Sequence, residues 1–96
     1  VSGTCARGEA VQGDAYVQMA DALRIVGEAL SELGASLNDV VRTVTFVTDM
    51  GDMDLVAKAH REAFGDVRPA ATIVQVAAFA DPAYKIEVQV DAIVEN

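Results

Sequence analysis

The chain has 96 residues with 15 acidic and 7 basic side chains, a formal net charge of −8, and one cysteine. Its length suits one domain with one small core, and its charge argues against nucleic acid or an anionic membrane as a partner. Cys5 has no second cysteine to pair with, and no segment is long and apolar enough for a membrane span or a secretory leader. We therefore expect a cytoplasmic protein without a membrane contact.

Hydrophobic residues make up 52% of the chain, although it has only two tyrosines, three phenylalanines and no tryptophan. Small apolar side chains in this proportion exceed what one small core needs, so we expect other subunits to cover part of the surface. The chain opens with VSGTC, which has the pattern of a strand interior. A homo-oligomer is therefore the first expectation about partners.

A periodic apolar pattern predicts a first helix of about 19 residues after Asp14. Apolar residues recur at intervals of three and four over residues 19–33, and polar residues such as Gln18 fall outside this stripe. Asp14 is placed to cap the first turn, and Gly34 lies where a left-handed residue ends a helix. Gly27 costs about 1 kcal/mol relative to alanine, so we expect another element to pack closely against it.

The next two elements are a strand over Val40–Thr48 and a shorter helix that ends at Gly65. The strand is β-branched almost throughout and carries apolar side chains on both faces, so both faces need cover. Asp52 is expected to cap the helix. The only histidine, His60, lies in the apolar stripe of this helix, so we interpret it as a packed side chain with one hydrogen bond.

Two strands complete the chain, one near Thr72–Val76 and one over Lys85–Val94. The last strand alternates apolar and polar residues, which predicts one core face and one polar face. The order strand, helix, strand, helix, strand, strand predicts an α+β fold. We expect one domain over residues 1–96, with two helices on one face of a mixed or antiparallel sheet.

Five stretches, in this order, resemble one family: VSGT, GASLNDVV, FVTDM, RPAATIVQV and YKIEVQVDAIV. The chain is similar to the Rid proteins, the reactive intermediate deaminase or YjgF-like family, which also carries the older label endoribonuclease L-PSP. The resemblance implies a chorismate-mutase-like homotrimer with sheets inside, helices outside and ligand pockets between subunits. It also implies an N-terminal hairpin that would precede Val1.

Deaminases of this family hydrolyse 2-imino or enamino acids to 2-oxo acids and ammonia, and the resemblance implies no metal and no organic cofactor. In the family, the arginine of a Pro-Ala-Arg-Ser/Thr motif holds the substrate carboxylate, and a glutamate of the last strand positions water. Matched by position, Glu87 is the predicted catalytic residue. Ser2 and Gly3 match the Ser-Gly pair that lines the pocket.

The motif that binds the carboxylate is altered in this chain. Residues 69–72 read Pro-Ala-Ala-Thr, so Ala71 stands where the family has arginine. Ile73 follows where some members have cysteine. The resemblance still predicts that Ala71, Thr72 and Ile73 border the ligand.

Another cation is then needed if the ligand is an anion. Arg68 is the first candidate because it lies three residues before Ala71, and Lys85 and Arg42 are weaker candidates for the same role. Cys5 lies close to the Ser-Gly pair, but no partner base is evident, so a nucleophilic role is disfavoured.

The sequence leaves three functions to compare. The first is a Rid-type hydrolase acting on imines, enamines or related small electrophiles, and the second is a non-catalytic trimer that binds a metabolite or partner in the same cleft. The third is the ribonuclease of the older family label. A charge of −8 without a basic stripe or paired histidines argues against this third function.

We expect no appreciable RNA binding at physiological salt, because seven scattered cations offer no patch to neutralise phosphates. Filter binding with a mixed-sequence RNA measures this directly. Retention at sub-micromolar protein concentration would reinstate the ribonuclease function.

Overall fold

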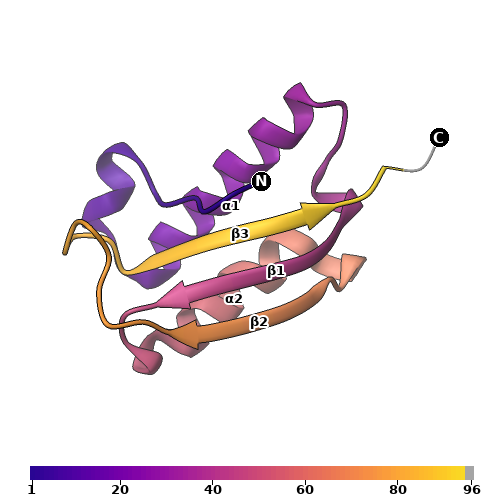
Figure 1. The fold of residues 1–96 in the computed structure, drawn as a ribbon. Coiled ribbons are helices and arrows are strands. Elements are labelled where there is room, and N and C mark those ends of the chain that lie inside the picture. Colours follow the sequence, from indigo (N-terminus) through magenta and orange to yellow (C-terminus); the bar gives the residue numbers. More distant parts are fainter. Residues whose placement is uncertain (95–96) are drawn as a thin grey trace.

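The protein is a layer of two helices packed on one face of a three-stranded sheet (Figure 1). The computed structural model describes residues 1–94. The predicted α+β class and the packing of both helices on one sheet face are confirmed. The helices are α1 (Ala15–Glu32) and α2 (Met53–Phe64), the strands are β1 (Val40–Val47), β2 (Ala70–Gln75) and β3 (Ile86–Ala92), and short 3-10 helices cover Gly8–Gln12, Leu37–Asp39, Met50–Asp52 and Gly65–Val67.

The sheet is mixed, with β1 in the centre. Strand β1 pairs parallel with β2 and antiparallel with β3. The N-terminal residues run along the outer edge of β3, where the Thr4 N–H donates to the Val88 carbonyl at 2.7 Å and the Val88 N–H donates to the Thr4 carbonyl at 3.0 Å. The beginning of the chain therefore lies beside its last strand. The strand predicted from VSGTC is reduced to one isolated bridge at Thr4.

The strand register assigns each side chain to one of two faces, because successive residues point to opposite sides of a sheet. The face against the helices, named here the covered face, includes the pairs Thr43–Val90, Thr45–Val88 and Val47–Ile86, all buried. The opposite side is named the open face. It carries the pairs Arg42–Asp91, Val44–Gln89 and Phe46–Glu87, which are half-buried or exposed.

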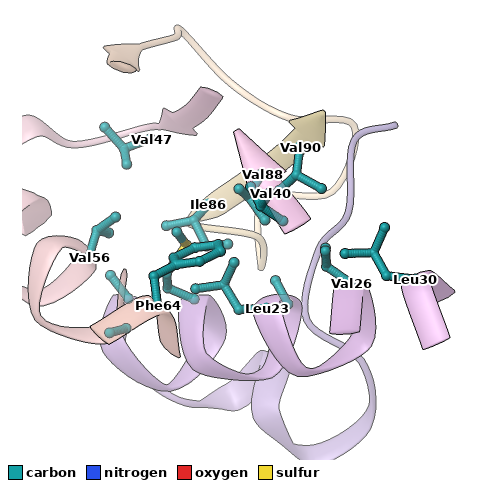
Figure 2. Close-up of a cluster of buried hydrophobic side chains, with 14 residues drawn as sticks. Leu23, Val26, Leu30, Val40, Val47, Val56, Phe64, Ile86, Val88 and Val90 are labelled. Carbon is teal, nitrogen blue, oxygen red and sulfur yellow. The ribbon is translucent and has the colours of Figure 1, made fainter. Parts of the chain in front are cut away.

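The core fills the space between the covered face and the two helices (Figure 2). Each fully buried Val, Leu, Ile or Phe side chain contributes roughly 1.5–3 kcal/mol relative to an exposed one. The helices cover one face of β1, so the open face is left without intramolecular cover. The larger core side chains are Met19, Leu23, Val26, Leu30, Val40, Val47, Val56, Phe64, Ile86, Val88 and Val90.

One predicted helix cap is present and the other is displaced. Asp14 caps α1, accepting from the Val17 N–H at 2.9 Å. The predicted cap by Asp52 is wrong, because the Asp52 side chain makes no capping hydrogen bond. A 3-10 turn precedes α2, and Asp49 caps that turn by accepting from the Gly51 N–H at 2.8 Å.

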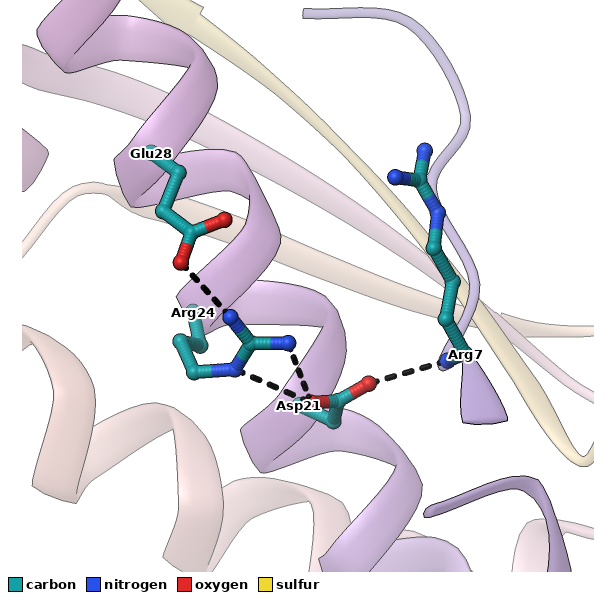
Figure 3. A network of polar contacts seen from close by, with 4 residues as sticks. All are labelled: Arg7, Asp21, Arg24 and Glu28. Atoms are coloured by element: carbon teal, nitrogen blue, oxygen red, sulfur yellow. Dashed lines mark hydrogen bonds and ion pairs between the residues drawn. The ribbon is translucent and has the colours of Figure 1, made fainter. Parts of the chain in front are cut away.

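A polar network attaches the N-terminal segment to α1 (Figure 3). The Asp21 carboxylate accepts from the Arg7 backbone N–H at 2.9 Å and forms an ion pair with Arg24, which also contacts Glu28 at 2.7 Å. Burial opposes the ionisation of Asp21, but these hydrogen bonds hold its pKa below the ordinary value. The carboxylate is therefore charged at neutral pH and fixes Arg7 against the helix.

Gly27→Ala is expected to raise the free energy of unfolding by roughly 0.5–1 kcal/mol. The expectation that another element packs closely against Gly27 is wrong, because a methyl group there would lie 3.6 Å from Leu37 Cγ, an ordinary contact distance. Urea unfolding at one fixed protein concentration measures the change.

Gly65→Ala is the contrasting variant. Gly65 has φ of 55° and ψ of −119°, a backbone conformation in which alanine is strained, so this substitution should lower the free energy of unfolding.

For Gly27→Ala, a loss of stability would contradict the packing described around α1.

Candidate functional site

The Glu87 side chain lies on the open face of β3, directly against Gly3. A methyl group on Gly3 would lie 2.7 Å from the Glu87 carboxyl carbon and closer still to Oε1, so a side chain at position 3 would displace the carboxylate from this position. Ser2 is exposed in the same segment, where its carbonyl accepts from the Thr4 hydroxyl at 3.0 Å. The structure therefore brings together three predicted site residues from opposite ends of the chain.

Cys5 borders this carboxylate. It is half-buried, and its pKa is raised first by burial and second by the negative charge of Glu87. A thiol with a raised pKa is protonated at neutral pH, and the thiolate is the nucleophilic form. The site therefore disfavours Cys5 as a nucleophile, as the sequence suggested.

Three further predicted site residues, Ala71, Thr72 and Ile73, lie on β2, which is separated from β3 by the central strand. Ala71 is paired with Thr43 and Ile73 with Thr45, so both lie on the covered-face side of β2. Thr72 is paired with Val44 and lies on the open face. Within one chain, position 71 therefore does not face Glu87, because the two side chains project from opposite sides of the sheet.

The three candidate cations are in different environments. Arg68 is exposed and has a left-handed backbone (φ 53°, ψ 57°) directly before Pro69. Lys85 is half-buried, and its Nζ donates to the Gly13 carbonyl at 3.1 Å. Arg42 lies on the open face, and its Nη1 is 3.7 Å from the Asp91 carboxylate.

His60 has the structural role predicted for it. Its Nε2 lies 3.0 Å from the Thr43 hydroxyl, and its ring centroid lies 4.6 Å from that of Phe64. Burial lowers the pKa of His60, which favours the neutral imidazole. The imidazole joins α2 to the covered face of the sheet and does not contact Glu87 or the open face.

Gln18 joins the segment before α1 to the residues before β3, and its predicted position outside the core is wrong. It was expected outside the apolar stripe of the first helix, but it is fully buried. Its Nε2 donates to the carbonyls of Val11 and Ala83 at 2.8 and 3.0 Å, and its Oε1 accepts from the Lys85 N–H at 2.8 Å. Gln18 thereby fixes the start of β3 relative to the N-terminal segment.

A separate groove of about 290 Å³ lies on the helix side of the molecule, between α1 and α2. Its lining includes Tyr16, Leu23, Leu37 and Glu62. None of the predicted site residues contributes to it, so it is distinct from the site around Glu87.

Two general findings concern the described part of the chain. Within residues 1–94, no group of three or more His, Cys, Asp and Glu side chains is arranged to hold a metal ion. No helix in the same range is both long and apolar enough to cross a membrane.

The fold and the site define a small α+β domain with a carboxylate on an uncovered sheet face. The family model described as Endoribonuclease L-PSP matches residues 1–94. The chain belongs to this family, which is the Rid or YjgF-like family that the sequence motifs resembled.

Relatives agree with this assignment. The chain is 36% identical over 81 residues to the uncharacterised protein SCO2049 of Streptomyces coelicolor, covering 84% of this chain and 60% of that protein. It is 34% identical over 71 residues to the 2-iminobutanoate/2-iminopropanoate deaminase of Mus musculus, covering 74% of this chain and 53% of that protein. The chain thus spans little more than half the length of these curated relatives.

Solved structures give the same result. Rv2704 of Mycobacterium tuberculosis, a member of the YjgF/YER057c/UK114 family, superposes with a TM-score of 0.90 at 40% sequence identity. The superposition covers 98% of this chain and 76% of that one. The fold described above is therefore that of the YjgF family.

Glu87→Gln is expected to lower the pKa of Cys5, because the charge of Glu87 is the second cause of its raised value. Burial remains in the variant, so the pKa should stay above the ordinary value. The chain has one cysteine, so the pH dependence of iodoacetamide labelling reports this thiol alone.

Asp91→Asn is the matched control for the Cys5 measurement. It removes a carboxylate from the same strand and the same face at a greater distance from Cys5. The contact between Glu87 and the N-terminal segment would be contradicted if Glu87→Gln left the labelling profile unchanged.

Proposed function

We propose that this protein binds a small electrophilic metabolite, such as an imine or enamine, and hydrolyses it with a water molecule oriented by Glu87. One observation carries the proposal: the Glu87 carboxylate lies against Gly3, the glycine of the Ser-Gly pair predicted to line the pocket. The similarity to a mouse protein named 2-iminobutanoate/2-iminopropanoate deaminase supports the substrate class.

The chemistry requires one carboxylate and one water. The water oxygen adds to the carbon of the C=N bond while Glu87 takes a proton from it, and the proton then passes to the nitrogen. The resulting carbinolamine transfers its hydroxyl proton to the amino group as the C–N bond breaks and the C=O bond forms, so an imine and water give a carbonyl compound and ammonia. A fixed carboxylate contributes mainly by positioning water next to a carbon that is already electrophilic.

The proposed assembly is a cytoplasmic homotrimer with the sheets inside and the ligand between subunits. The open face includes the half-buried Val44 and Phe46 and the exposed Val74, none of which the helices cover. Within one chain, Ala71 and Ile73 project from the side of the sheet opposite to Glu87, so they do not form one pocket with it. A neighbouring subunit would bring a second β2 or open face to the carboxylate.

The proposed substrate range is not limited to 2-imino acids. The family's guanidinium is absent at Ala71, and its loss removes two charge-assisted hydrogen bonds to a substrate carboxylate. At roughly 1.5–3 kcal/mol each, they correspond to about two to four powers of ten in kcat/KM. Efficient hydrolysis of a 2-imino acid therefore requires another cation at the site.

Glu87→Gln is expected to lower the rate of imine hydrolysis by about 10²–10⁴-fold, because the amide cannot accept the water proton. An amino-acid oxidase that generates the imine, coupled to detection of the 2-oxo acid, measures the rate above the uncatalysed background.

Glu32→Gln, at an exposed carboxylate of α1 on the helix side, is the control and should retain the rate. An unchanged rate in Glu87→Gln would contradict the role of Glu87. A wild-type rate equal to background would support the non-catalytic binding protein instead.

A further inference from the structure

We propose that Arg42 binds the anionic group of the ligand, in place of the guanidinium that position 71 lacks. The assignment rests on the proposed function, since it names the anion-binding residue of the same site. It also predicts the ligand class: a small carboxylate whose reactive carbon lies close to the carboxyl group.

The register of the sheet is the first observation behind this assignment. Arg42 is the only cationic residue in the three strands. It is paired with Asp91, and Glu87 is paired with Phe46, so Arg42 and Glu87 project from the same open face. Ala71 lies on the covered-face side, so a cation there would not share the face of its own chain's Glu87.

The separation of the two residues suits a short ligand. Glu87 lies four residues from Asp91 along β3, which places the Cα atoms of Arg42 and Glu87 about 14 Å apart at about 3.4 Å per residue. The proposal places the ligand carboxylate on the Arg42 guanidinium and the water molecule on Glu87 within this span.

The guanidinium of Arg42 is available for exchange. Its Nη1 lies 3.7 Å from Asp91, and the two side chains are 59% and 67% exposed. An exposed ion pair of this kind contributes little to stability, because both groups are well solvated. A ligand carboxylate that accepts two parallel hydrogen bonds from the guanidinium gives a better-defined contact than this long pair.

Three other cations have partners elsewhere in the described structure. Arg24 is paired with Asp21 and Glu28, Lys85 donates to the Gly13 carbonyl, and Lys58 lies over the Tyr16 ring at 5.0 Å. Arg68, before β2, and Arg7, in the N-terminal segment, are both exposed, so they are the competing candidates. Asp91 is the natural competitor of the ligand for Arg42.

Calorimetric titration with 2-oxobutanoate tests the assignment, because this stable 2-oxo acid carries the carboxylate without the reactive imine. Arg42→Ala should weaken binding by about 10–100-fold. The affinity of Arg42→Lys should lie between those of Arg42→Ala and wild type, because an ammonium group keeps the charge but not the two parallel N–H donors of the guanidinium. Asp91→Asn should tighten binding several-fold by removing the competing carboxylate. Binding of the uncharged 2-oxobutanamide should be the same in Arg42→Ala and wild type.

Arg61→Ala is the matched control, since Arg61 is an exposed arginine on α2, on the helix side. Circular dichroism and light scattering establish that each variant keeps its fold and assembly. The assignment is overturned if Arg42→Ala binds 2-oxobutanoate as tightly as wild type, if wild type does not bind it, or if Arg68→Ala alone abolishes binding. Failure of the proposed function is a separate result: wild type would then hydrolyse neither a 2-imino acid nor its neutral amide.

Discussion

The two-residue periodicity of β1, fixed by its pairing on both sides, decides which groups of this protein face the helices and which face outward. Thr43, Thr45 and Val47 close the core, so the alternate residues Arg42, Val44 and Phe46 form the open face. A shift of one residue would exchange the two sets. An irregularity between Val40 and Arg42 adjusts the register, so that Val40 is also buried.

Helix α1 fixes the site from the other side of the sheet. Gln18 binds the segments on both sides of the candidate site, and Asp21 binds the backbone of Arg7. The half-buried hydrogen bonds of Gln18 and the exposed hydrogen bond of Asp21 hold the N-terminal segment beside β3, where Gly3 lies against Glu87. A polar group buried in this way is costly to leave without its partners, so the arrangement resists displacement.

The sequence predicts the elements well where a strong local pattern exists. The apolar stripe of α1, the cap at Asp14 and the alternation of β3 all follow from local spacing. Strand β2 reads Ala-Ala-Thr-Ile-Val-Gln, which has no alternation, so only its pairing with β1 assigns Ala71 and Thr72 to opposite faces. The cap near α2 was predicted at the wrong residue because Asp49 and Asp52 are equally good capping residues in the sequence. A 3-10 turn precedes α2, and Asp49 caps that turn.

Long-range contacts account for what the sequence could not predict. Gln18 bonds to residues 65 and 67 positions away, and no spacing rule distinguishes such a glutamine from a solvated one. The contact of Gly3 with Glu87 likewise joins the two ends of the chain. The family motif predicted that both residues belong to one pocket. Arg42 was a weaker candidate for the anion-binding cation in the sequence, and it became the first candidate only when the register placed it on the face of Glu87.

The central claim is that the site around Glu87 is completed by a neighbouring subunit placed over the open face. Multi-angle light scattering at micromolar concentration tests it most directly, because one chain has a mass of 10.1 kDa and the proposed trimer has three times that mass. We expect about 30 kDa, with the Cys5 labelling rate rising when the assembly is diluted into monomers. A mass near 10 kDa for a protein that still hydrolyses imines would contradict it.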